Sequence, residues 1–201
     1  MTNTTAIIVS YNTPELMQSC YESLRRHYPY MKAILVDGSP KLSKCWKYVG
    51  TRSPKINTVR SIGFNIGHGN GMKLGIELCQ TEYFLLMDSD VTIDKPGVLE
   101  SMHEGMADGV YGTGSIQLVN DKGMNDEAGF PYLHPHFALV NKSEYLKYPE
   151  IINHGAPMLS AMLANPNIVP FPVSDYITHH ERGTRKLNPK AFHPKNWDKI
   201  Q

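Results

Sequence analysis

Short apolar runs separated by segments with helical spacing constrain the fold of this chain most strongly. Residues 6–9, 33–36 and 83–87 are each almost wholly apolar, and residues 56–59 form a weaker strand pattern between them. Strands that are apolar on both faces and alternate with helices are typical of a parallel sheet covered on both sides. We therefore expect an α/β fold with a mixed, mostly parallel central sheet flanked by helices.

The helices between these strands begin at recognisable residues. Pro14 is suited to the first turn of a helix, and Thr13 stands at the N-cap position before it. A short helix is expected near residues 42–48, and a Gly-rich turn leads into a helix over residues 67–79. These three helices complete an alternating strand–helix pattern in the first half.

The second half has a less regular pattern. Strands are predicted over residues 110–119 and 137–140, and a helix over residues 155–164. Residues 168–173 predict a last strand, which its prolines assign to the edge of a sheet.

Length and charge restrict the organisation and the partners. The chain has 201 residues, 41% of them apolar, which is enough for one core and predicts a single domain over residues 1–201. With 20 basic and 19 acidic residues the formal charge is only +1, so no broad nucleic-acid surface is expected.

Three cysteines, Cys20, Cys45 and Cys79, do not make a disulfide framework. Reduced thiols and the lack of a signal peptide or membrane-length apolar run predict a cytoplasmic protein, peripheral to the membrane if its acceptor is a lipid.

Polar groups follow three of the predicted strands at the point where each ends. These groups are residues 10–12, residues 37–39 and residues 88–90. Open α/β sheets bind ligands beyond the carboxyl ends of their parallel strands. The topology therefore predicts a binding site at this rim.

Asp88 and Asp90 are two carboxylates placed just after a buried strand. Such neighbours repel each other unless a cation or protons compensate, and Mg²⁺ or Mn²⁺ is suited to do so. A solvated turn rich in Asp and Ser is the alternative interpretation of this tripeptide.

Four motifs in order resemble those of the family 2 glycosyltransferases, which have the GT-A fold. They are the opening strand at residues 6–12, the second strand with its Asp at residues 34–39, the Asn-x-Gly stretch at residues 65–71 and the strand ending in Asp-x-Asp at residues 84–90. The resemblance implies a metal-dependent enzyme that moves a sugar from a nucleotide-diphosphate sugar, most often a UDP-sugar, to a hydroxyl acceptor.

The resemblance also implies roles for individual residues. Asp37 would accept a hydrogen bond from the base, Asp88 would reach the ribose or the metal, and Asp90 would bind Mn²⁺ or Mg²⁺ directly. The residues expected to contact the nucleotide-sugar are Ser10, Tyr11, Asn12, Asp37, Gly38, Asn65, Gly67, His68, Asp88, Ser89 and Arg182. On this basis residues 1–95 form the donor half, residues 96–185 the acceptor half, and residues 186–201 a tail.

Histidines of the second half fit the same resemblance. His179 is expected to complete the metal site, with His180 as the alternative, and Arg182 or Arg185 would contact the diphosphate. His134 and His136 alternate along a strand, so they would share a face and help to shape the acceptor pocket.

The general base is where the chain departs from the family. The family places a Glu-Asp pair before the late strand, but residues 152–158 contain no carboxylate. His154 is the nearest candidate, and Asp126 and Glu127 are alternatives from a loop.

The missing pair leaves two other functions open. One is a nucleotide-sugar-binding module without catalysis. The other is a sugar nucleotidyltransferase, although its Gly-rich phosphate loop is absent after the first strand. The acceptor could be a glycan, a lipid-linked sugar or another hydroxyl compound, and the sequence does not identify the oligomeric state.

Overall fold

The computed structural model describes residues 3–52, 57–151, 158–180 and 183–187. Two sheets contain its strands: β1 Thr4–Ser10, β2 Lys32–Asp37, β3 Asn57–Ser61, β4 Tyr83–Asp88, β5 Val91–Ile93, β6 Gly112–Val119, β7 Phe130–Asn141, β8 Ile168–Pro170 and β9 Ile177–His179. Helices connect them: α1 Pro14–His27, α2 Lys44–Gly50, α3 His68–Leu78, α4 Val98–Glu104, α5 Lys142–Tyr145, α6 Leu159–Leu163, the 3-10 helix η1 Val173–Asp175 and α7 Gly183–Leu187.

The central sheet has the strand order β3-β2-β1-β4-β7-β6-β8. Strands β3, β2, β1 and β4 are parallel to one another, whereas β7 is antiparallel to both β4 and β6. Strand β8 pairs in parallel with β6 at the edge, so the prediction of an edge strand is confirmed. The mixed, mostly parallel α/β sheet is confirmed as well.

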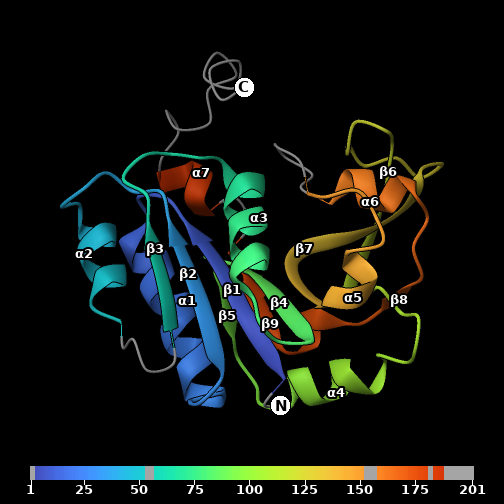
Figure 1. Cartoon of the computed structure of the whole chain (residues 1–201), viewed down its shortest axis with the longest axis horizontal. Helices are drawn as coiled ribbons and strands as arrows, with labels where there is room; N and C mark the ends of the chain where they lie inside the picture. The colour runs from blue at the N-terminus through green and yellow to red at the C-terminus, as the bar shows by residue number, and fades with distance from the viewer. Residues whose placement is uncertain (1–2, 53–56, 152–157, 181–182, 188–201) are drawn as a thin grey trace.

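Helices cover both faces of the parallel strands (Figure 1), which explains why these strands are apolar on both sides. In β1, Ala6 and Ile8 pack into the core beneath α1 and α4, whereas Ile7 packs into the core beneath α3. The predicted helix after Pro14 is confirmed, although the buried Thr13 hydroxyl at its N-cap makes no cap hydrogen bond.

The second half differs from the sequence prediction in its strands. Strand β7 begins at Phe130, seven residues before the predicted start. Its first part was not predicted, because Pro131 and Pro135 argue against a strand there. After β8 the chain turns into η1, so the prediction of a strand up to residue 173 is wrong there. The predicted helix over residues 155–164 corresponds to α6, and residues 155–157 lie outside the described part.

A second sheet of two strands lies beside the rim of the first. Strand β5 follows directly after residues 88–90 and pairs with the late strand β9, with Val91 opposite His179. This pairing brings the end of the chain's second half against the Asp-x-Asp turn.

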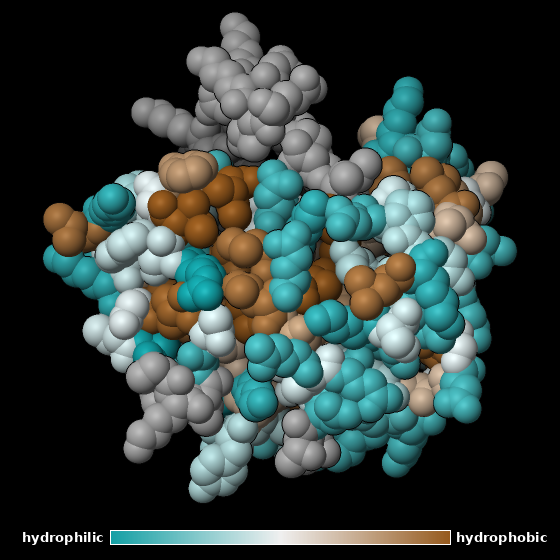
Figure 2. Space-filling view, in the orientation of Figure 1, coloured by the Kyte–Doolittle hydropathy of each residue, from teal (hydrophilic) through white to brown (hydrophobic). Residues whose placement is uncertain are grey.

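The surface is mixed in polarity. On the face in Figure 2, hydrophobic side chains gather over the strands between α2 and α3, and hydrophilic ones cover α4. Among the described helices, none has the length and apolar character needed to cross a membrane.

Candidate donor and metal site

Asp37 lies at the end of β2, fully buried, and its two carboxylate oxygens have different surroundings. Oδ1 accepts hydrogen bonds from the hydroxyls of Ser10 (2.9 Å) and Ser39 (2.6 Å), from the Ser39 N–H (3.2 Å) and from the Cys45 thiol (3.5 Å). Oδ2 is buried without a partner among the described residues. Oδ1 of Asp37 therefore stabilises the turn after β2, whereas Oδ2 can accept a hydrogen bond from a further donor.

The backbone around Asp37 is held tightly by its neighbours. The Gly38 N–H donates to the Ser10 carbonyl at 3.0 Å, and a Cβ on Gly38 would lie 2.9 Å from the Phe64 carbonyl oxygen. The Asn12 N–H donates to the Ser39 hydroxyl at 2.7 Å, and Tyr11, between Ser10 and Asn12, is half-buried. Only glycine fits at position 38, because the loop before α3 passes directly over it.

The Asn-x-Gly stretch forms the entry to α3. The Asn65 side chain accepts a hydrogen bond from the Gly67 N–H at 2.9 Å, and Gly67 has a φ of 79°, which favours glycine. Further along α3, a Cβ on Gly71 would lie 2.5 Å from a Val9 methyl, and one on Gly75 would lie 2.3 Å from an Ile7 methyl. These two glycines allow close packing of the helix on β1.

Asp88 ends β4 and faces His68, the first residue of α3. The His68 Nε2 lies 3.0 Å from the Asp88 Oδ1. Burial opposes charge on both groups, but their mutual attraction outweighs it. The pKa of His68 is therefore raised and that of Asp88 is held well below its usual range in the metal-free protein.

Asp90 lies after the turn at the buried Ser89 and is buried itself. Its Oδ2 accepts a hydrogen bond from the Gly183 N–H at 3.1 Å, and its Oδ1 lies 3.5 Å from the His179 Nε2. The carboxylate is therefore oriented by the chain just beyond β9, with one oxygen turned toward His179.

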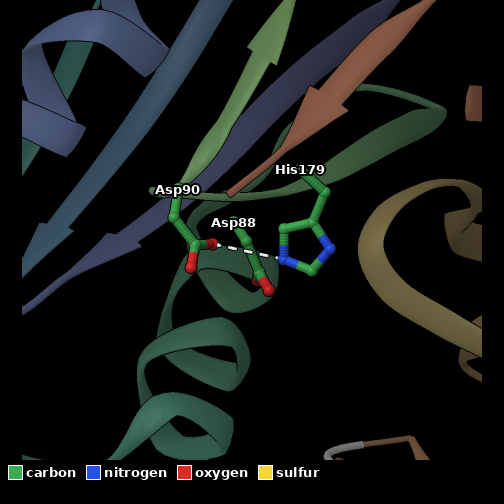
Figure 3. A group of neighbouring side chains, drawn as sticks. All are labelled: Asp88, Asp90 and His179. Carbon is green, nitrogen blue, oxygen red and sulfur yellow. Dashed lines mark ion pairs between the residues drawn. The ribbon is translucent and has the colours of Figure 1, made fainter. Parts of the chain in front are cut away.

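Asp88, Asp90 and His179 each offer one ligand atom, and these atoms lie within 4.8 Å of one another. Figure 3 shows the three side chains converging from β4, the turn after it and β9. His180 is exposed, and its backbone N–H donates to the Asp90 carbonyl at 2.8 Å. Two carboxylates and one imidazole suit a divalent ion such as Mn²⁺, so these residues fit the metal that the sequence predicts.

A pocket of about 500 Å³ opens beside this cluster. Its lining comes from β6, β7, η1 and β9: Ser115, Gln117, His134, His136, Val173, Ser174, Ile177 and His179. The lining contains imidazoles, hydroxyls and an amide but no carboxylate among the described residues. No sequence motif marks three of these lining residues, Ser115, Gln117 and Ser174, so the sequence did not predict them.

The prediction that His134 and His136 share a face is confirmed by contact between their rings. Their Nδ1 atoms lie 2.5 Å apart, and the His136 ring stacks on His179 with centroids 4.7 Å apart and an interplanar angle of 14°. Burial, with repulsion from His134 adding to it, lowers the pKa of His136 from 6.5 to about 4. Burial also lowers the pKa of His134.

The remaining predicted residues lie away from this pocket or outside the described chain. Asp126 and Glu127 are exposed in the loop between β6 and β7, where the Asp126 carboxylate accepts a hydrogen bond from the Ala128 N–H. His154 and Arg182 lie outside the described residues, as does the side chain of Arg185.

Comparison with known proteins gives a family match. A family model described as Glycosyl transferase family 2 matches residues 5–165, well over half of the chain. None of the curated protein sequences matches this chain.

Solved structures share the fold at low sequence identity. The crystal structure of S. aureus TarS 1–349 in complex with UDP-GlcNAc has a TM-score of 0.66 and 16% identity, covering 100% of this chain and 64% of that one. The mannosyltransferase PcManGT from Pyrobaculum calidifontis in complex with GDP-Man and Mn²⁺ has a TM-score of 0.64 and 16% identity, covering 85% of this chain and 55% of that one. GalNAc-T7 with UDP, GalNAc and Mn²⁺ has a TM-score of 0.66 and 9% identity, covering 88% and 43%. This chain therefore has the GT-A fold and spans less than two thirds of the length of each.

Proposed function

The chain belongs to glycosyl transferase family 2, and from that premise we propose that it transfers a sugar from a UDP-sugar to a hydroxyl acceptor with the help of a divalent metal. The observation that carries the proposal is the convergence of Asp88, Asp90 and His179, whose ligand atoms lie within 4.8 Å of one another. The same rim of the sheet presents Asp37, whose second carboxylate oxygen is free of partners among the described residues.

The hydrogen bonds of Asp37 favour uracil as the base. Uracil offers one N–H on its pairing edge, which matches the single unpartnered oxygen Oδ2. Guanine offers two neighbouring donors, but Oδ1 already accepts from Ser10 and Ser39. Because Asp37 is fully buried, the base reaches Oδ2 only if surrounding side chains move aside.

In this proposal the diphosphate of the donor binds at the metal cluster. Asp90 and His179 would hold the ion directly, and Asp88 would bind it or its waters after His68 releases the carboxylate. An Mn²⁺ or Mg²⁺ ion there would neutralise the charge that develops on the departing diphosphate. Arg182 is proposed to add a positive charge on the same group.

The pocket beside the metal site is the proposed place of the acceptor. It has hydroxyl, amide and imidazole groups from Ser115, Gln117 and His134, which suit a ligand rich in hydroxyl groups. Attack by an acceptor hydroxyl on the sugar carbon, opposite the leaving diphosphate, gives inversion at that carbon.

A thermal-shift screen tests the proposal without knowledge of the acceptor. UDP, UDP-GlcNAc, CDP, GDP and GDP-Man are each added with Mn²⁺ or with EDTA. A ligand of the native state raises the melting temperature by mass action. We expect UDP and UDP-GlcNAc to raise the melting temperature only when Mn²⁺ is present. If none of the nucleotides gives a metal-dependent shift, the proposal is wrong. Binding without sugar transfer to any acceptor pool would favour a binding module.

A further inference from the structure

The segment His134-Pro135-His136 lies in an irregular part of β7. Strand β6 pairs Gly114 with Ala138 and then Ile116 with Leu133, so one residue of β6 faces four residues of β7. Pro135 has no N–H to give to the ladder, and bulges of this kind turn side chains toward active sites. The bulge is what directs both imidazoles into the pocket.

The hydrogen bonds inside this bulge assign the tautomers of the two rings. The backbone N–H of His136 donates to the Nδ1 of His134 at 3.3 Å, so that nitrogen carries a lone pair. The Nδ1 of His136 lies 2.5 Å from the same atom and must therefore be the N–H donor. A neutral imidazole has one N–H, so the Nε2 of His136 carries the unshared pair.

His136 is placed between the two halves of the site. Its ring stacks on His179, one of the proposed metal ligands, and it lines the pocket proposed for the acceptor. No described residue donates a hydrogen bond to its Nε2. A basic nitrogen is thus held beside the metal site on the acceptor side.

We propose that the Nε2 of His136 is the general base that takes the proton from the acceptor hydroxyl, an inference that rests on the proposed function. The acceptor oxygen bonds to the sugar carbon, and the bond from that carbon to the diphosphate oxygen breaks with its electron pair leaving on UDP. The acceptor proton moves to Nε2. His134 stabilises the resulting imidazolium by accepting the Nδ1–H of His136, as a carboxylate does in other catalytic dyads.

The carboxylates of the metal cluster and of residues 126–127 are less well placed for this role. Asp88 and Asp90 belong to the metal cluster. Asp126 and Glu127 lie beyond Phe130, six strand positions from His136, which corresponds to a separation on the order of 15 to 20 Å.

The tautomer can be measured in the wild-type protein without any turnover. Long-range proton–nitrogen NMR correlations of protein labelled with ¹⁵N-histidine are recorded at neutral pH, metal-free and with Mg²⁺, and assigned by comparison with His136→Asn and His134→Asn. We expect His136 to carry its proton on Nδ1 and His134 on Nε2. The opposite assignment for His136 would overturn the proposal.

The catalytic role is tested by UDP release from UDP-GlcNAc with Mn²⁺, water serving as the acceptor. His136→Asn keeps an N–H near the position of Nδ1 but has no basic nitrogen. We expect release to fall by about 10²- to 10⁴-fold, with Mn²⁺-dependent UDP binding by calorimetry unchanged. The control Asp121→Asn changes an exposed residue that does not line the pocket and should keep the rate.

The two proposals fail in different ways. If the wild type does not bind UDP with Mn²⁺, the proposed function is wrong. If the wild type binds and releases UDP and His136→Asn does so at the same rate, only the assignment of the base is wrong.

Discussion

The proposed donor half (residues 1–95) and the proposed acceptor half (residues 96–185) build their parts of the candidate site by different means. In the donor half, Ser10, Asp37 and Asp88 end three neighbouring parallel strands, and the polar groups there are carboxylates and hydroxyls. In the acceptor half, His134 and His136 come from a bulge between antiparallel strands, and the pocket is lined by imidazoles and neutral groups.

The two halves differ in how far the positions of their polar groups depend on contacts between distant segments. Ends of adjacent parallel strands meet at one edge of a sheet whatever their loops do, so the donor groups follow from the strands alone. A bulge and the pairing of β5 with β9 depend on contacts between distant segments.

The largest expected effect comes from the proposed metal ligands, which lie between the two halves. Asp90→Asn keeps an oxygen that can accept from the Gly183 N–H but removes the charge that would bind the ion. We expect the affinity for Mn²⁺ in the presence of UDP to fall at least about 100-fold, equivalent to about 2.7 kcal/mol, as measured by calorimetry. The exposed Asp121→Asn is the control, and equal affinity in Asp90→Asn and the control would remove Asp90 from the metal site.

The next effect tests base recognition within the donor half. In Asp37→Asn, the donors Ser10 and Ser39 should fix the amide oxygen at the Oδ1 position, which turns the NH₂ group toward the base. An NH₂ group opposes the uracil N–H but pairs with the unprotonated ring nitrogen of cytosine. We expect UDP to bind roughly 30-fold more weakly, and CDP to bind more tightly than UDP. Unchanged preference for UDP over CDP would show that Asp37 does not contact the base.

A stability effect tests the close packing beneath the donor half. A Cβ in Gly75→Ala would lie 2.3 Å from the stiff side chain of Ile7, so α3 must move away from β1. We expect a loss of about 1 to 2 kcal/mol in the free energy of unfolding, measured by urea denaturation. In the matched control Gly50→Ala, the added Cβ meets no atom within 4 Å, so the stability should stay equal or rise slightly.

The smallest effect is on the free energy of unfolding of the metal-free protein, measured in EDTA as a function of pH. It concerns His136 in the acceptor half. The folded pKa of His136, about 4, lies below its usual value of 6.5, so the neutral ring stabilises the fold above pH 6.5. This contribution is lost as the pH falls toward 4, because the unfolded chain then binds the proton more readily.

Between pH 7 and pH 5.7 the wild type should therefore lose roughly 1 kcal/mol more stability than His136→Asn. Urea denaturation of both proteins across this range measures the difference, with Ser174→Ala as a variant that should follow the wild type. Parallel curves for the wild type and His136→Asn would show that the imidazole is not kept neutral by burial. His68, whose pKa is raised, remains in both proteins and largely cancels in the comparison.

Much of the fold could be predicted from local sequence patterns. The strands up to Asp88, the helices α1 and α3 and the family follow from residues close together in the chain, because a buried strand or a helix entry is a local pattern. The first part of β7 could not be predicted, because its prolines argue against a strand, and only the bulge beside β6 accommodates Pro135.

The sequence by itself determined that three parallel strands present Ser10, Asp37 and Asp88 at one rim, since strand order and direction place their ends together. Only the tertiary structure decided that His179 rather than its neighbour His180 turns toward Asp90. It also decided that His136 lies against His179, with no hydrogen-bond donor to its Nε2 among the described residues. The physical reason is that these choices depend on strand register between distant segments, β5 with β9 and β6 with β7. A shift of one residue in either register would turn a different side chain into the site.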